Sequence, residues 1–212
     1  MAHPLTSSGP SQETPSGNHP GRRANAYSGS ANLASPGSGT ALMLGSHAAT
    51  PPKTLILGIG NILLTDEALG VVVVRRLEAE GDLEDVALLD GGTLSFTLSG
   101  SIADSPRLIV VDAAVMGEAP GTVRVFEGEA MDRQLSGIAK SVHEVSLMDL
   151  LDMARITDSL PRCRALVGVE PAQVDWGDEL SPEVAAAVPE AMARIRALLN
   201  LWDRREAGTD LD

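Results

Sequence analysis

The feature that most constrains this chain is a repeated alternation between short apolar runs and longer amphipathic segments. Four runs are rich in Val, Leu and Ile, a composition typical of strands that are buried on both faces. They cover residues 54–58, 85–90, 107–112 and 164–169. Segments with helical character lie between and after them, at residues 66–80, 93–103, 143–154 and 181–202. This alternation predicts an α/β fold with a mostly parallel sheet covered by helices.

Two segments have less clear patterns. Residues 66–80 place Leu69, Val72, Val73 and Leu77 at the spacing of one helix face, although their β-branched run leaves a strand as a competing interpretation. Residues 121–127 alternate in polarity and predict a fifth strand with one more exposed face. We therefore expect a three-layer arrangement, in which a twisted five-stranded sheet lies between helices.

The chain divides by composition into a tail, a domain and a short end. Residues 1–52 are rich in Ser, Gly and Pro and show no hydrophobic periodicity before Ala41, which predicts a disordered tail. Met43 is an alternative start of the protein, in which case the preceding residues are an over-called extension. The folded domain is expected at residues 53–203, followed by a flexible C-terminal tail at residues 204–212.

Charge and cysteine content exclude several classes of function. The net charge of −13 argues against a nucleic acid or an anionic membrane surface as the partner. No apolar run approaches the roughly 20 residues of a transmembrane helix. The single cysteine, Cys163, excludes a disulfide within the chain and fits a cytoplasmic location. With only Cys163 and His143 in the expected domain, a structural Cys/His zinc site is excluded as well.

Acidic residues gather where several predicted strands end. Glu67 lies shortly after the first strand, Asp90 and Asp112 end the second and third strands, and Glu170 follows the last one. In open α/β sheets, ligands bind outside the carboxyl ends of the strands. We therefore expect these carboxylates to converge on one edge of the sheet.

Each candidate also has a structural interpretation. Asp66 and Glu67 can serve the dipole of the helix that they begin. Asp112 can cap a turn, and His143 can be an ordinary residue of a first helical turn. The Gly58-x-Gly60 turn invites a dinucleotide interpretation, but two acids follow it and would repel a pyrophosphate.

Taken together, two carboxylates and one imidazole at the same sheet edge form a mixed oxygen and nitrogen donor set. Such a set suits nickel, zinc or iron and leaves coordination positions open. The sequence contains neither a His-Glu-x-x-His nor a Gly-x-Ser-x-Gly motif. Cys163 lies before a strand, at the opposite end from the acids, and we interpret it as structural.

The chain resembles the hydrogenase maturation endopeptidases, which process the large subunit of nickel–iron hydrogenases. The resemblance covers residues 54–199 and depends on five segments in the same order. The segment Gly-Ile-Gly-Asn-Ile-Leu-Leu-Thr-Asp-Glu at residues 58–67 is the specific one. The others are Asp-Gly-Gly-Thr at 90–93, Leu-Ile-Val-Val-Asp-Ala at 108–113 with Pro-Gly-Thr at 120–122, His143 before a Leu-rich helix, and Leu-Val-Gly-Val-Glu-Pro at 166–171.

The resemblance implies an activity and a set of site residues. Glu67, Asp112 and His143 match the metal-contacting positions of the family, and Asp90 is a candidate base or positioning residue. The implied substrate is the precursor of a large subunit, whose C-terminal extension is removed only after nickel has entered its active site. The nickel thus belongs to the substrate, and no organic cofactor is expected. The peptidase is expected to be of an aspartyl type or metal-assisted, and Gly58, Gly60, Gly91 and Gly92 are expected to let the partner chain approach closely.

Three alternatives remain open at this point. A non-catalytic nickel metallochaperone would hold the metal at the same three residues. Another peptidase of the same fold, such as a spore-germination type, would act on a different substrate. A nucleotide-binding module would use the glycine turn instead of the acids.

Overall fold

The computed structural model describes residues 52–136 and 142–208, with the backbone alone for residues 142–146. The expected N-terminal tail and Met43 lie almost entirely outside these residues, so both stay predictions. No helix within the described ranges combines the length and the apolar character that crossing a bilayer requires.

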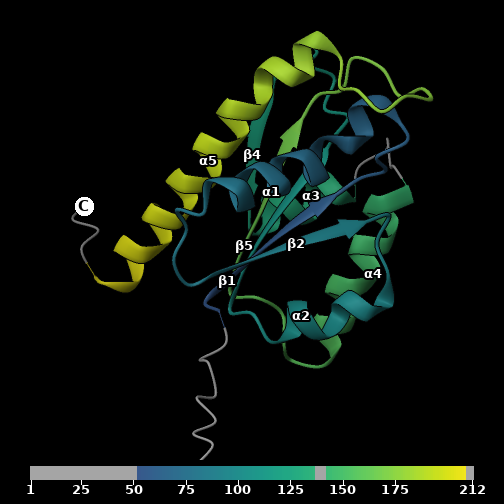
Figure 1. The fold of residues 1–212 in the computed structure, drawn as a ribbon. Coiled ribbons are helices and arrows are strands. Elements are labelled where there is room, and N and C mark those ends of the chain that lie inside the picture. Colours follow the sequence, from purple (N-terminus) through teal and green to yellow (C-terminus); the bar gives the residue numbers. More distant parts are fainter. Residues whose placement is uncertain (1–51, 137–141, 209–212) are drawn as a thin grey trace, which may run out of the picture. The chain divides into compact units, whose positions relative to one another are not determined.

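The sheet has five strands in the order β2-β1-β3-β5-β4 (Figure 1). These are β1 (Thr54–Ile59), β2 (Val86–Gly92), β3 (Arg107–Ala113), β4 (Val123–Glu127) and β5 (Cys163–Val169). The β1–β2, β1–β3 and β3–β5 pairs are parallel, whereas β4 runs antiparallel to β5 at the edge. All residues of β1 and β3 are buried, which explains why these two strands read as unbroken apolar runs. The predicted mostly parallel five-stranded sheet is confirmed.

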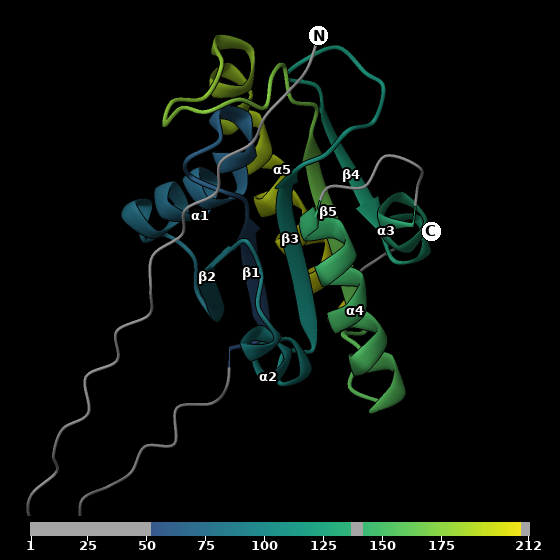
Figure 2. The same cartoon turned by 90° about the vertical axis from the view of Figure 1, so that its right-hand side faces the viewer.

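Helices cover both faces of the sheet. The helices α1 (Leu69–Glu80) and α5 (Pro182–Glu206) share one apolar core with the strands. The helices α2 (Ser99–Ala103), α3 (Glu129–Leu135) and α4 (Val142–Ile156) lie over the other core. Figure 2 shows α4 in front of the strands and α5 behind them. The expected three layers are therefore present.

Helix boundaries differ from the sequence-based prediction by one or two residues at α4 and by more in four other places. A 3₁₀ turn, η1 (Thr65–Ala68), precedes α1, so the predicted helix at 66–80 begins as a tighter turn. The predicted helix at 93–103 is broken, because Leu94 has a positive φ and a second 3₁₀ turn, η2 (Phe96–Leu98), leads into α2. The short α3 was not predicted. Helix α5 begins as expected at its N-cap Ser181 but continues four residues beyond Trp202.

Burial of Arg107 explains why α5 is longer than predicted. Arg107, the first residue of β3, is 1% exposed. Its guanidinium lies 2.7 Å from Asp203 Oδ1 and 2.7 Å from Glu206 Oε1, and Lys53 lies 2.7 Å from Glu206 Oε2. A buried guanidinium requires carboxylate partners, and the last turn of α5 supplies them. Residues 204–206 are therefore helical rather than part of a flexible end.

Candidate active site

The strand order reverses between β1 and β3, and this fixes where a ligand can bind. From β1 the chain moves to β2 on one side, and it then returns to β3 on the other side of β1. Crevices at such a switch point, beyond the carboxyl ends of the strands, are the usual binding sites of open α/β sheets. Asp112 lies in β3 at this end, opposite Gly168 of β5, and is 3% exposed. A carboxylate buried at the switch point is the central feature of the candidate site.

Glycine contacts bring Glu67 to the same place. A Cβ atom on Gly70 would lie 2.2 Å from the carbonyl oxygens of both Ile59 and Val111, so the start of α1 rests directly on the backbone of β1 and β3. A Cβ on Gly60 would lie 1.7 Å from the carbonyl oxygen of Glu67. Only glycine permits such approaches. The backbone of Glu67 is thereby fixed beside the carboxyl ends of the two central strands.

The side chain of Glu67 is half-buried and has no hydrogen-bond or ion-pair partner among the described residues. It belongs to η1, and the first turn of the longer helix α1 contains no acid. Interaction with the dipole of α1 therefore does not account for the position of Glu67. A carboxylate that is held in place but left without a partner is available to a ligand.

Asp66, the neighbour of Glu67, has a different role. It is fully buried, and its Oδ2 accepts hydrogen bonds from Ala172 N at 2.8 Å, Gln173 N at 3.0 Å and Ser181 Oγ at 2.9 Å. Its Oδ1 accepts a fourth from Ser181 N at 2.7 Å. Asp66 thus ties η1 to the loop after β5 and to the N-cap of α5, and its role is structural. Sequence reasoning missed this role because all the partners lie more than 100 positions away.

Thr65 strengthens the same connection and has a strained backbone, with φ at +25°. Its N–H donates to Gly177 O at 2.9 Å, and Gly177 N donates to Leu63 O at 3.0 Å. The Thr65 hydroxyl donates to Gln173 O at 3.1 Å and accepts from Asp175 N at 3.0 Å. Strained residues persist where their surroundings over-determine them, and they cluster at functional sites. The loops after β1 and β5 therefore lie side by side as one unit, at the top of both ribbon views (Figures 1 and 2).

Asp90 lies in β2, on the far side of β1 from Asp112, and its side chain is partnered. Arg75 of α1 donates to its Oδ2 at 3.0 Å, and Gly92 N donates to its Oδ1 at 3.0 Å. Asp90 and Arg75 line a shallow hollow of about 200 Å³ beside Gly60. Asp90 therefore orients the turn after β2, which favours a positioning role over that of a free base.

His143 lies in the first turn of α4, but its side chain is outside the described part of the structure. The described side chains contain no group of three His, Cys, Asp or Glu residues that is arranged to hold a metal ion, and that search does not include His143. The structure thus brings Glu67 and Asp112 to one edge. The participation of His143 stays a prediction.

A fourth acid, Glu170, follows β5 and is 7% exposed. Its Oε2 accepts from Met116 N at 2.7 Å and from Glu118 N at 3.1 Å, so it shapes the loop after β3. Like Asp66, it is a structural carboxylate at this edge, satisfied by backbone N–H groups.

The expectation that glycines make room for a partner chain is wrong at three of four positions. The space beside Gly58 is filled by the Gly70 carbonyl oxygen at 2.2 Å, and the space beside Gly91 by the Leu57 side chain at 2.7 Å. The space beside Gly60 is filled by the carbonyl oxygen of Glu67. Of the four glycines, only Gly92, at φ +50°, faces open space. The chain's own packing therefore uses three of the four glycines.

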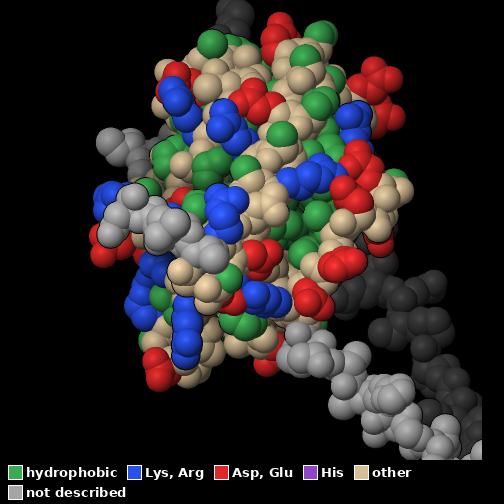
Figure 3. All heavy atoms as spheres, turned by 90° about the vertical axis from the view of Figure 1, so that its left-hand side faces the viewer, with side chains coloured by type: hydrophobic (Ala, Val, Ile, Leu, Met, Phe, Trp, Pro, Cys, Tyr) green, Lys and Arg blue, Asp and Glu red, His purple; other side chains and the backbone are tan. Residues whose placement is uncertain are grey.

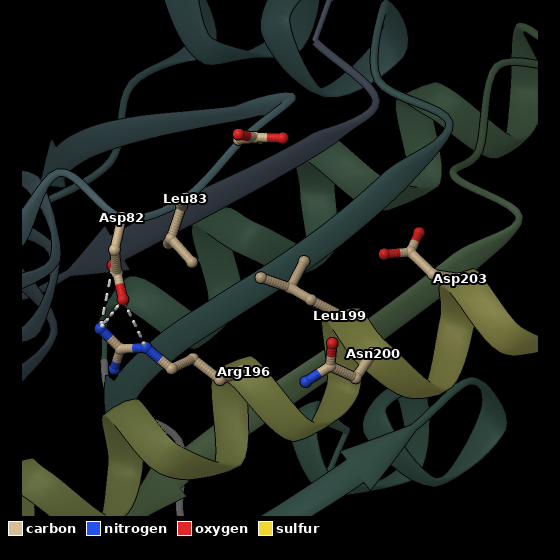
Figure 4. A pocket seen from close by; sticks show the side chains of 7 residues that line it. Asp82, Leu83, Arg196, Leu199, Asn200 and Asp203 are labelled. Atoms are coloured by element: carbon tan, nitrogen blue, oxygen red, sulfur yellow. Dashed lines mark hydrogen bonds and ion pairs between the residues drawn. The ribbon is translucent and has the colours of Figure 1, made fainter.

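A hollow of about 340 Å³ lies at the opposite, amino edge of the sheet, between the turn before β2 and α5 (Figure 4). Its lining cation, Arg196, pairs with Asp82 at 3.0 Å and also with Glu80. Cys163 begins β5, so it too lies at the amino edge, as predicted. Two of the lining acids are paired, Asp82 with Arg196 and Asp203 with Arg107 and Lys53, and the hollow lies at the edge away from Asp112, which gives no support for a reactive site there.

Comparison with known proteins agrees with this geometry. Residues 71–198 match the model of the hydrogenase maturation protease family, and the matched range includes Asp90, Asp112 and His143. The hydrogenase 2 maturation protease of Escherichia coli K12 is 38% identical over 160 residues, which cover 74% of this chain and 94% of the relative. The hydrogenase expression/formation protein HupM of Azotobacter chroococcum is 39% identical over 150 residues, covering 70% and 72%.

Solved structures give the same result. The hydrogenase maturating endopeptidase HybD of E. coli superposes with a TM-score of 0.64 at 36% identity, covering 74% of this chain and 94% of that one. The [NiFe] hydrogenase maturation protease HybD of Thermococcus kodakarensis has a TM-score of 0.60 at 30% identity, covering 69% and 98%. This chain therefore belongs to the hydrogenase maturation protease family, and it is a hydrolase, an endopeptidase of hydrogenase maturation.

Proposed function

We propose that this protease removes the C-terminal extension from the nickel-loaded precursor of a nickel–iron hydrogenase large subunit. In this proposal the nickel arrives with the substrate, and Glu67, Asp112 and His143 contact it. One observation carries the proposal: a glycine-packed turn holds Glu67, whose side chain has no partner among the described residues, beside the switch point at which Asp112 is buried.

The donor set suits the proposed recognition. Carboxylate oxygens and an imidazole nitrogen are ligands that nickel accepts, and an incomplete protein set leaves room for the precursor's own ligands. Contact with the metal would place the peptide bond to be cut at the carboxyl edge of the sheet. Hydrolysis then adds water across that bond, with the metal or a neighbouring acid activating the water or polarising the carbonyl.

Asp90 is proposed as a positioning residue for this step. Its hydrogen bond to Gly92 N and its ion pair with Arg75 fix the turn that borders the hollow beside Gly60. Its effect on cleavage would therefore pass through the shape of that hollow, and Asp90→Asn should raise KM more than it lowers kcat.

The deciding experiment mixes the protein with a nickel-loaded, C-terminally extended large subunit and, separately, with the nickel-free form. The intact mass of the large subunit is followed over time. Loss of a C-terminal peptide from the nickel-loaded form alone is the expected result. Equal cleavage of both forms would contradict nickel recognition, and retention of nickel without peptide release would favour the metallochaperone.

A further inference from the structure

Large apolar side chains are exposed mainly at one edge of the molecule. Among the described residues, six of the eight large exposed apolar side chains lie in segments that follow the carboxyl ends of strands: Ile62, Leu63, Phe96, Val115, Val174 and Trp176. We call Ile62, Leu63, Val174 and Trp176 the apolar rim, because they belong to the two loops that Thr65 joins. Trp176 is 83% exposed. Exposed apolar patches of this kind mark interaction surfaces.

The apolar rim is rigidly supported. The two loops form a bridge between Leu64 and Gly177, and Asp66 and Thr65 hold the loop after β5 through six further hydrogen bonds. The loops are therefore ordered by folding rather than by binding, which lowers the entropic cost of docking. The same turn carries Glu67, so a protein held by the apolar rim lies next to the candidate active site.

The charges around the apolar rim indicate what it binds. Asp175, Asp178 and Glu179 flank Trp176; all three are exposed, and within the described ranges no side-chain partner is found for them. On the side of the molecule shown in Figure 3, by contrast, Lys and Arg side chains lie next to Asp and Glu side chains. Uncompensated acids around an apolar centre complement a partner with cations around an apolar anchor.

We infer that the apolar rim is the docking surface for the precursor protein, and that it receives a segment with large apolar side chains flanked by Lys or Arg. The inference rests on the proposed function for the identity of that partner. A second copy of this chain is a poorer occupant, because a two-fold contact would bring the same acids face to face in a protein with a net charge of −13.

Steady-state processing of the nickel-loaded precursor provides the first test. Trp176→Ala should raise KM about tenfold with little change in kcat, because a central aromatic side chain dominates such contacts. Ile156→Ala is the matched control, since Ile156 is 85% exposed but ends α4 at the amino edge. Replacing Asp175, Asp178 and Glu179 together by their amides should weaken the dependence of KM on salt. Equal KM values for Trp176→Ala and Ile156→Ala would overturn the inference.

Labelling with 5-fluorotryptophan separates docking from cleavage. The chain has two tryptophans, and Trp202 is 1% exposed, so it serves as an internal reference. Addition of the unlabelled nickel-loaded precursor should shift the ¹⁹F resonance of Trp176 and leave that of Trp202 unchanged. A shift without any cleavage would support docking while the proposed activity failed. Cleavage without a shift, or a shift produced by raising the concentration of this chain alone, would overturn the docking surface.

Discussion

The two edges of the sheet treat their carboxylates in opposite ways. At the amino edge, Asp203 and Glu206 surround the buried guanidinium of Arg107. At the carboxyl edge, Asp66 is satisfied by backbone N–H groups and a hydroxyl, and Glu67 beside it has no partner among the described residues. One sheet thus carries a charge-compensated edge that secures the last helix and an edge whose charge is left for a ligand.

The comparison teaches that burial alone does not distinguish structural from functional acids. Asp66 is fully buried at the carboxyl edge, where its oxygens accept hydrogen bonds from a loop of its own chain. What distinguishes Glu67 is a fixed backbone combined with an uncommitted carboxylate. Mutations at the two edges should therefore separate activity from stability.

The largest effect is expected for Glu67→Gln. Loss of the charged oxygen should reduce kcat/KM for the nickel-loaded precursor about 100-fold or more, because contacts to a metal are worth several kcal/mol. The thermal midpoint should stay near that of the wild type, since the Glu67 side chain makes no hydrogen bond or ion pair with the described residues. Glu84→Gln, an exposed acid at the amino edge, is the control and should keep full activity. Wild-type activity in Glu67→Gln would remove Glu67 from the site.

A smaller effect, on stability as well as activity, is expected for Asp66→Ala. The change leaves three backbone N–H groups and the Ser181 hydroxyl without their acceptor, at a cost of about 3 kcal/mol in the free energy of unfolding. Urea denaturation measures this loss. Activity should fall with it, because the loop after β5 is released. If Asp66→Ala were as stable as Glu67→Gln, the proposed division between these neighbours would be wrong.

Arg107→Met tests the amino edge. We expect a loss of about 2 kcal/mol in the free energy of unfolding, since two ion pairs disappear while the apolar stem is replaced. The kcat/KM of the remaining folded protein should be unchanged, because the edge is remote from Asp112. Denaturation and processing assays on the same sample check both parts. A selective loss of activity at full stability would tie this edge to the reaction.

The smallest effect concerns pH. The Arg164 guanidinium, 2.6 Å from Asp132, holds the pKa of that carboxyl below its usual range, and the Arg107 guanidinium does the same for the pKa of Asp203. A lowered pKa in the folded state contributes stability above the unfolded value of about 4, and this contribution is lost as the pH falls through the folded pKa.

Urea midpoints measured between pH 5 and pH 2 should therefore fall. Asp132→Asn should lose about 1 kcal/mol at pH 7 and show a shallower fall in acid. Parallel curves for Asp132→Asn and the wild type would mean that this pair does not contribute to the acid response.

The strands were predictable from sequence because their signal is local. Unbroken apolar runs identified β1, β3 and β5, and alternation around Val123 identified β4 as a strand with one more exposed face. Helix α3 escaped prediction because its seven residues bury only Met131 and Leu135, which is too little for a periodic signal. The break before α2 depends on the positive φ of Leu94, and a leucine at this position does not predict that conformation.

The site was predictable in part. The positions of Glu67 and Asp112 followed from strand ends and from the resemblance, and the structure brings both to the switch point. The structural role of Asp66 could not be predicted from the sequence, because it accepts hydrogen bonds from Ala172 and Ser181, which are distant in the chain. The use of Gly58 and Gly60 for internal packing depends on the same kind of distant contact.

The contact between the loops after β1 and β5 joins an early and a late part of the chain during synthesis. Thr65 and Asp66 leave the ribosome early, but their partners at residues 172–181 are among the last parts of the domain to be made. Contacts across more than 100 positions form slowly and only after the intervening strands are in place. A nascent chain that has not reached residue 172 lacks the N–H groups that bind Asp66, and it lacks Val174 and Trp176 of the apolar rim. The part of the apolar rim that carries Trp176 therefore forms only after β5 has been made.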